Sequence, residues 1–528
     1  MEPTNENPTA AITNRNLNDL PDEILIHILT FLPTLNSVET SLISQKWRPL
    51  WSRVPSLDFN YQLFPPHEHP SHTSQFYVEF VDRALISRLN YPLHTFRLSF
   101  LYDEHYRSTV DSWVRSAVAR LRARELFLDF FIETDVRDEQ KPTYDFPFYV
   151  LRDGCVEKLS LTSCDLTLPA KLSTMRFGSI RFICFNHVYL EDQAVKDLLS
   201  ACPNLEVLEI NSCLGPHHLE ICSTSLRRLI LEFGYIPKQK QTLLVDCPKL
   251  CSISIHSCDF EECVLKNASS LVVFHVDFPH RIDGSYRPWS NVVRLLEQAP
   301  NVKHLNVQNW WFKFLTSKNT FPESFILHNL KLLVLRTGCT QYDLVGMAAL
   351  LKLCPNLETL ILENPFKMEK DESLPEELLK KPVHFSMPSL KQVKLKAYIG
   401  RQCSILKILI EQGVVLEKIV LLIDQVGQNE PLPPIILNRK VSQAWEISGY
   451  NTSAAVINGC VEKLSLTRCD LRQPAKLSAM GFGSIGSVII EDMEMEGSSK
   501  ITNTRNLNDL PEDLLLHVLT FFPTLNSV

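Results

Sequence analysis

The sequence predicts a multidomain chain in which a small all-helical unit precedes an α/β solenoid of short repeats. Two observations lead to this prediction. A compact run of helix-forming residues spans 18–51, and a six-residue template, apolar-x-x-apolar-x-apolar, recurs many times after it. At 528 residues the chain is too long for one ordinary globular core. It therefore needs several domains or an array of repeats.

Composition argues against two classes of partner. The formal net charge is −7 and the pI is about 6.2, which leaves no basic surface for nucleic acid and no cationic face for a membrane. Residues 1–15 lack the apolar core of a signal peptide, and no stretch approaches the roughly 20 apolar residues that span a bilayer. We expect a soluble protein of the cytoplasm, the nucleus or both, with neither nucleic acid nor membrane as a partner.

The sequence carries no recognisable catalytic or metal-binding constellation. Its 15 cysteines are odd in number and scattered, which is typical of reduced thiols. It has no CxxC pair, no His pair at zinc-finger spacing, no glycine-rich phosphate loop, no GxSxG and no HExxH. We expect no metal, no cofactor, no catalytic residues and no enzymatic activity.

Residues 18–51 read as a run of short helices. Pro21 suits the first position of a helix, two acidic residues follow it, and apolar residues recur at helical spacing until Pro33. Thr34 is expected to cap a second helix and Ser44 a third short turn. So small a unit carries more large apolar side chains than it can bury alone, so part of its surface should face a partner.

This segment resembles an F-box, through Leu20-Pro-Asp-Glu-Ile-Leu, Ile28-Leu-Thr-Phe-Leu-Pro and Ser44-Gln-Lys-Trp-Arg-Pro-Leu-Trp. The resemblance implies docking on a Skp-family adaptor that is itself bound to the cullin of a ubiquitin ligase. By position, the docking candidates are Leu20, Pro21, Ile24, Ile28, Leu29, Leu32, Pro33, Val38, Leu42, Ser44 and Trp47. Some of this segment's apolar residues, Leu25, Leu42 and Trp47 especially, could instead only pack the helices against each other.

The repeated template predicts a row of short strands, because apolar residues alternate within each copy. Its spacing and sequence resemble leucine-rich repeats. The clearest copies are 205–210, 226–231, 250–255 and 357–362, and looser copies begin at Leu93, Val156, Ile180, Leu271, Val302, Leu330 and Leu390.

Amphipathic segments precede several of these strands, at 192–203, 292–300 and 344–355, and read as helices. Each repeat would then pair a strand on the concave side of a horseshoe with a helix on its convex side. Three cysteines, Cys164, Cys213 and Cys258, fall where leucine-rich repeats place Asn or Cys against the turn. We expect these thiols to be structural rather than reactive.

Residues 386–426 are predicted to form a strand, a helix and a strand. Through Ser389-Leu-Lys and Leu416-Glu-Lys-Ile they resemble the FBD region of a plant family that combines it with an F-box and leucine-rich repeats. We expect this short α/β region to cap the apolar end of the solenoid.

The chain then copies parts of itself: residues 459–485 nearly repeat a segment that begins at 154, and 505–528 nearly repeat 15–38. The second F-box copy lacks the counterpart of Glu39 to Trp51, so we expect it to be flexible and unable to dock. The predicted division is a disordered N-terminus (1–14), an F-box (15–60), leucine-rich repeats (90–385), the FBD-like region (386–426), a linker (427–452), a partial repeat copy (453–495) and the truncated F-box copy (496–528).

Three functions fit this organisation. In the one we favour, the F-box docks the adaptor of a Skp–cullin–F-box ubiquitin ligase while the concave strands bind an unknown target protein. The alternatives are a small-molecule-gated sensor with a polar pocket in the concave face, and a repeat scaffold without ligase activity. Because apolar template positions point into the core, the residues between them face out. The predicted target-binding residues are Glu209, Arg228, Ser254, His275 and Asn306.

Overall fold

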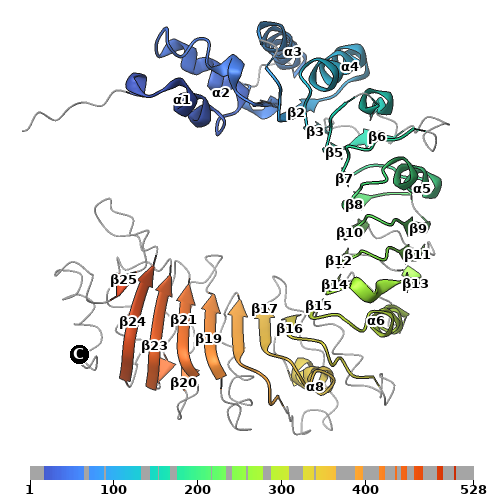
Figure 1. Cartoon of the computed structure of the whole chain (residues 1–528), viewed down its shortest axis with the longest axis vertical. Helices are drawn as coiled ribbons and strands as arrows, with labels where there is room; N and C mark the ends of the chain where they lie inside the picture. Colours follow the sequence, from blue (N-terminus) through green and yellow to red (C-terminus); the bar gives the residue numbers. More distant parts are fainter. Residues whose placement is uncertain are drawn as a thin grey trace, which may run out of the picture. The chain divides into compact units, whose positions relative to one another are not determined.

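A computed structural model describes residues 17–422 and six short strands between 435 and 506, apart from the segments 65–69, 89–90, 132–142, 153, 167–174, 216, 234–240, 257–259, 278–286, 309–324, 338–340, 364–386 and 397–415. The chain divides into two compact units. Unit 1 comprises Met1–Leu226 and Glu232–Gly234, and unit 2 comprises Arg227–Leu231 and Tyr235–Val528. A parallel sheet runs through each of them (Figure 1).

The N-terminal helical unit has the helices that the sequence predicts. α1 (Asp22–Leu29) follows Pro21 and α2 (Thr34–Glu39) follows Pro33, and the fixed φ of proline suits the entry to a helix. Short 3-10 turns complete the unit at η1 (Leu17–Asp19), η2 (Thr40–Leu42) and η3 (Trp51–Arg53). Its small buried core consists of Leu25, Leu29, Trp47, Leu50 and Val54.

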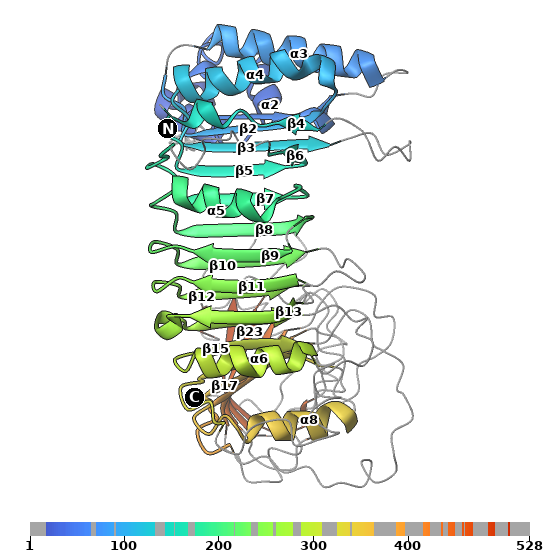
Figure 2. The same cartoon turned by 90° about the vertical axis from the view of Figure 1, so that its right-hand side faces the viewer.

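Unit 1 continues from this helical unit into a parallel sheet. Each strand pairs in register with the next, in the order β1 (Ser56–Asn60), β2 (Thr95–Leu101), β3 (Glu125–Phe131), β5 (Lys158–Thr162), β7 (Phe182–Asn186) and β8 (Val207–Cys213). Figure 2 shows α3 (Pro70–Ser87), α4 (Arg107–Arg115) and α5 (Asp192–Ala201) on the same face of this sheet. Unit 1 also contains the strands β4 (Tyr144–Asp145), β6 (Cys164–Asp165) and β9 (His218–Cys222), which lie outside this parallel sheet.

Unit 2 contains a second run of parallel strands. They are β12 (Ser252–His256), β14 (Val273–Asp277), β15 (His304–Gln308), β16 (Leu332–Arg336), β17 (Thr359–Glu363), β18 (Gln392–Lys396) and β19 (Leu416–Leu422), and neighbours pair in that order. α6 (Arg287–Gln298) and α8 (Gln341–Leu351) lie between successive strands in the chain, as predicted. β11 (Gln241–Asp246) pairs in parallel with β13 (Phe260–Lys266), and β10 (Arg228–Phe233) spans the boundary of the two units.

Every predicted copy of the template leads into a strand, which starts two residues after the first apolar position of the copy. Leu205 and Leu250, for example, are buried two residues before β8 and β12. Within the parallel sheet of unit 1, two strands were not predicted, β1 and β3. Their first apolar positions hold Val54 and Ala123, and both are buried like their leucine counterparts. Burial, rather than leucine itself, defines the repeat.

The strands continue past the region expected to cap the solenoid. β18 and β19 fall within 386–426 and extend the parallel sheet, while the helix expected between them lies outside the described residues. The predicted linker, 427–452, also differs from expectation, because it contains β21 (Ser442–Ser448), which pairs with β19. Trp445 and Ile447 alternate there, opposite Ile419 and Leu421, and this short alternation is the sequence signal of a strand.

The partial repeat copy contributes β23 (Cys460–Thr467), which pairs with β21, and β24 (Ser484–Glu491), which pairs with β23. β20 (Ile435–Ile436) pairs with β22 (Ile457–Asn458) in a separate short ladder. Of the second F-box copy, the structure describes only β25 (Arg505–Asn506), which lies antiparallel to β24. The prediction that this copy is flexible concerns residues that lie outside those the structure describes.

Positive φ angles occur at or beside the ends of three successive strands of unit 1, at Ser163 (53°), His187 (51°) and Ser212 (51°). The residue that follows each of them is buried. Cys164 and Cys213 occupy that position and contact the carbonyl oxygens of Thr162 and Asn211, each with Sγ at 3.4 Å. Burial raises the pKa of the Cys213 thiol to about 11 and that of Cys164 well above its ordinary value. These two thiols are structural, and Cys258 lies outside the described residues.

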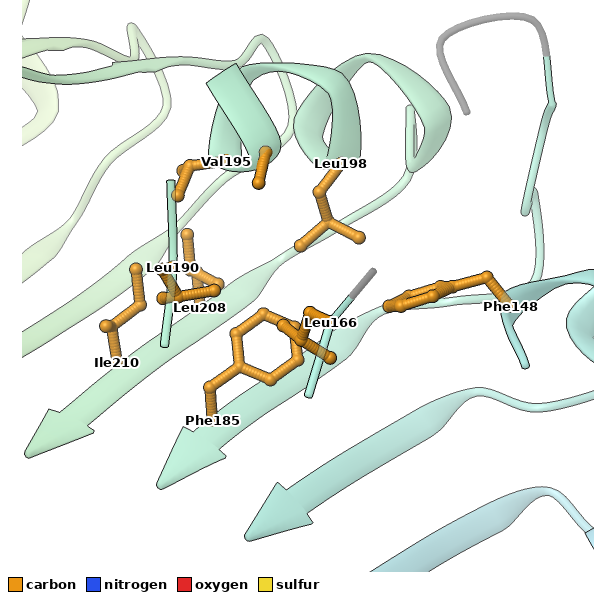
Figure 3. Close-up of a pocket in the computed structure, with 9 residues that line it drawn as sticks. Phe148, Leu166, Phe185, Leu190, Val195, Leu198, Leu208 and Ile210 are labelled. Atoms are coloured by element: carbon orange, nitrogen blue, oxygen red, sulfur yellow. The ribbon is translucent and has the colours of Figure 1, made fainter. Parts of the chain in front are cut away.

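A small apolar cavity lies between α5 and strands β7 and β8 (Figure 3). Its volume is about 10 Å³, close to the minimum that holds one water molecule, and it offers such a molecule no polar partner. The residues that line it are Phe148, Leu166, Phe185, Leu190, Ala194, Val195, Leu198, Leu208 and Ile210. It is therefore a dry packing space beneath a helix.

Truncation beside this cavity should destabilise the chain. Leu208 is fully buried, and Leu208→Ala would enlarge a space that is already empty, so we expect a loss of about 2–5 kcal/mol in the free energy of unfolding. The measurement is urea unfolding of the full chain. The matched control is Val207→Ala, because Val207 directly precedes Leu208 in β8 and lies on the other face of the sheet. This variant should lose well under half as much free energy of unfolding. Equal losses would contradict the assigned core face.

Candidate partner-binding surfaces

The helical unit exposes a set of large apolar side chains, which we call the apolar set: Leu17, Ile24, Phe31, Leu32, Leu42 and Ile43. Leu42 is 89% exposed and Phe31 is 74% exposed, although both are large apolar residues in a folded unit. Exposed apolar side chains concentrated in one small unit mark an interaction site.

The structure divides the predicted docking residues into three groups. Pro21, Ile24, Leu32 and Leu42 are exposed. Five are half-buried, namely Leu20, Ile28, Pro33, Val38 and Ser44. Leu29 and Trp47 are buried in the core and have no side-chain surface to offer a partner, so we remove them from the docking set. Leu17, Phe31 and Ile43 are exposed apolar residues of the same unit that the sequence prediction did not include.

The segment before α1 is held by a network around Asn18. The Asn18 side-chain oxygen accepts hydrogen bonds from Trp47 Nε1 at 2.8 Å and from Ser44 Oγ at 3.1 Å. Lys46 Nζ donates to the carbonyl oxygens of Asn18 at 2.7 Å and Leu20 at 2.6 Å. Ser44, expected to cap a helical turn, instead binds Asn18. Ser44 and Trp47 thus position the residues that enter α1.

An ion pair supports the other side of α1. Arg53 Nη1 lies 2.9 Å from Asp22 Oδ2, and Asp22 is the first residue of the helix. An acidic residue at this position also interacts favourably with the positive end of the helix dipole. Both partners are partly exposed, so the pair contributes modestly to stability, and its main effect is to tie η3 to α1.

Two hydrogen bonds join the helical unit to the first strands of unit 1 and to the helix beside them. The sequence predicts that Thr34 caps α2, but the cap residue is Pro33, and Thr34 Oγ1 instead accepts a hydrogen bond from the Asp58 backbone N of β1 at 2.7 Å. Arg88, which follows α3 and is 2% exposed, donates from Nη2 to the Val54 carbonyl at 2.6 Å. The helical unit therefore has a fixed orientation on the sheet.

Each sheet has an open face, made of the residues that alternate with the buried positions of its strands. In unit 1 it carries Glu209 on β8, which is half-buried. In unit 2, Ser254, His275 and Asn306 are register partners on β12, β14 and β15, so three predicted target-binding residues form one row. Arg228, on β10, is exposed.

Two further observations bear on chemistry. The described residues contain no group of three or more His, Cys, Asp or Glu side chains arranged to hold a metal ion. In the same part of the chain, no helix combines the length and the apolar character needed to cross a membrane.

Family models match the two parts of the chain that carry these surfaces. A family model for the F-box domain matches residues 17–59, and one described as "At1g61320/AtMIF1, LRR domain" matches residues 88–431. The second match extends through 386–426, as strands β18 and β19 do. Neither model describes a catalytic domain.

Relatives from Arabidopsis thaliana carry the F-box in their names, and two of the following three also carry the LRR repeat. The F-box/LRR-repeat protein At4g14096 is 28% identical over 361 residues, which cover 66% of this chain and 72% of the relative. The putative F-box protein At3g58860 is 30% identical over 360 residues, 65% and 73% of the two chains. The F-box/FBD/LRR-repeat protein At1g13780 is 27% identical over 433 residues, 77% and 90%. The chain belongs to the plant family of F-box/LRR-repeat proteins.

Proposed function

We propose that this protein recruits targets to a Skp–cullin–F-box ubiquitin ligase. The observation that carries the proposal is the combination of an F-box, whose apolar set is exposed, with a repeat sheet that has an open polar face. An F-box implies binding to a Skp-type adaptor. The adaptor would connect this chain to the cullin, and the open face would hold the target, in the cytoplasm or the nucleus.

The function needs no chemistry from the chain itself. A tethered target is presented to the ubiquitin-carrying enzyme at an effective concentration in the millimolar range when the geometry allows both to be engaged. The Thr34 and Arg88 contacts fix the helical unit on the first strands of unit 1, which supports such a defined geometry. A loosely tethered F-box would spread the target over a larger volume.

One experiment separates this proposal from a repeat scaffold without ligase activity. The full chain is co-expressed with a Skp-family adaptor and a cullin, and purified by a tag on the chain. Stoichiometric recovery of both partners is the expected result. Recovery of the chain without the adaptor would favour the scaffold. No observation favours a small-molecule sensor, since the cavity beneath α5 is apolar and lies on the helix side.

The apolar set should supply most of the adaptor-binding energy. We expect Ile24→Ala with Leu42→Ala to weaken adaptor binding at least ~30-fold, since a central anchor costs about 2 kcal/mol or more when truncated. Both side chains are exposed, so the thermal midpoint should hardly change. Ile86→Ala, on α3 and 81% exposed, is the matched control. Titration of the adaptor gives the affinities, and equal affinity of the double variant and the control would refute the site.

The Asn18 network should matter for docking through position rather than contact. Asn18→Ala leaves Trp47 Nε1 and Ser44 Oγ without their acceptor, and we expect it to cost about 1–3 kcal/mol in stability. Adaptor binding should weaken with it. Asn18→Asp retains an acceptor beside Lys46 and should restore both quantities. A loss of binding in Asn18→Asp equal to that in Asn18→Ala would show that Asn18 contacts the adaptor directly.

The row on unit 2 should contribute to target capture. Ser254→Arg with Asn306→Arg places two bulky charged groups on this row, and we expect proximity labelling in cells to recover fewer target proteins. Glu297→Arg, exposed on α6, is the control and should leave the labelled set intact. If the double variant labels the same proteins to the same extent, recognition lies outside this row.

A further inference from the structure

The open face of unit 1 carries a lysine that lies against two aromatic rings. Lys158, on β5, has its Nζ 5.1 Å from the ring centre of Phe127 on β3 and 4.8 Å from that of Phe182 on β7. β3 and β7 are the two neighbours of β5 in the sheet. All three side chains are half-buried and alternate with fully buried residues of their strands. The sheet register therefore brings one ammonium between two rings.

The other cations nearby have carboxylate partners. Arg97, which also lies over the Phe127 ring at 4.7 Å, pairs with Asp58 at 3.6 Å. At the edge of the sheet Arg124 pairs with Glu157 and Arg181 pairs with Glu206.

Lys158 differs from them. Its register partner is Glu125, whose Oε2 instead accepts a hydrogen bond from Thr95 Oγ1 at 3.0 Å. Among the residues that the structure describes, none places a carboxylate within ion-pair distance of Lys158 Nζ. Its three N–H donors remain available to an anionic group.

The rings prepare this ammonium for binding. A free lysine side chain loses rotamer entropy when it captures an anion, but contact with two rings already restricts the Lys158 stem. The rings also displace water from one side of the charge, which strengthens an electrostatic contact on the other side. Beside the ammonium, their remaining surface is apolar. A ligand that fits has one anionic group next to an apolar or aromatic side chain.

Charge on the same face limits how many anionic groups a ligand can carry. Asp58, Glu125, Asp129 and Glu209 all lie on the open face of unit 1, against the cations Arg97 and Lys158. A polyanion such as nucleic acid would be repelled by these carboxylates. Binding of a protein segment with a single carboxylate, by contrast, does not require the surface to be basic overall.

We propose that the open face of unit 1 binds a target segment in which Asp or Glu is flanked by apolar side chains, with the carboxylate on Lys158 Nζ and the apolar groups against Phe127 and Phe182. This rests on the proposed function, because it specifies the target that the ligase subunit recruits. It adds a site in unit 1 to the row Ser254, His275 and Asn306 of unit 2.

The test uses the full chain in complex with its adaptor. The complex is applied to an array of synthetic peptides that share the same flanking residues and differ only in a three-residue core. The four cores are Phe-Glu-Phe, Phe-Gln-Phe, Phe-Lys-Phe and Phe-phosphoserine-Phe. We expect Glu cores to be retained over Gln and Lys cores. Fluorescence anisotropy with the best Glu peptide then gives the Kd for each variant. Lys158→Gln should raise the Kd at least about tenfold, as loss of a charged hydrogen bond does. Glu125→Gln should lower it, because a neighbouring negative charge is removed.

Lys196→Gln is the matched control, since it removes the same charge from α5, where Lys196 pairs with Glu220 at 2.8 Å on the helix side. It should leave the Kd unchanged. Retention of Lys cores, exclusive retention of phosphoserine cores, no preference for Glu over Gln, or equal effects of Lys158→Gln and Lys196→Gln would each overturn the proposal. Adaptor recovery is measured on the same variants. If the adaptor is recovered normally but the peptides show no preference for Glu, only this inference is rejected. If the chain prefers Glu peptides but does not recover the adaptor, the ligase role is rejected and the site is kept.

Discussion

Parallel strands that pair in register keep equivalent residues on the same face from one repeat to the next. Since side chains alternate along a strand, a shift of one residue would exchange the buried and open faces. The register places Leu159 and Leu161 in the core and Lys158 on the open face, level with Phe182 of the next strand. The same rule aligns Ser254, His275 and Asn306 in unit 2. Each proposed binding feature of the sheets therefore depends on this pairing.

The pairing also explains which parts of the chain were predictable. Template copies at positions such as 205–210 and 250–255 were identified because buried positions accept only apolar residues. β3 escaped detection because a small residue, Ala123, fills its first position. β21 lies in a segment rich in proline at its start, and only its short Trp445 to Ile447 alternation indicated a strand.

The burial of side chains in the helical unit was predicted less well than the strands. Helical periodicity shows which residues share a face of α1, but not which face the rest of the unit covers. Leu29 and Ile24 both fit an apolar stripe, yet Leu29 is fully buried and Ile24 is exposed. The position of Trp47 depends on a hydrogen bond to Asn18, 29 residues away in the chain. The contact of Lys158 with two rings likewise depends on side chains from three strands, which no local pattern encodes.

The apolar set of the helical unit and the open faces of the sheets differ in polarity, and this difference matches the partners proposed for them. The apolar set is suited to an interface with a permanently bound partner, because long-lived interfaces are more apolar than transient ones. The open faces instead carry charged and amide groups, such as Asn211, which donates to Asn186, which in turn donates to Thr162. Polar groups held in a fixed array gain little from nonspecific apolar contact and discriminate by charge and hydrogen bonding. In the proposed function, an apolar F-box surface suits an adaptor that stays bound, and a polar sheet suits targets that are selected, modified and released.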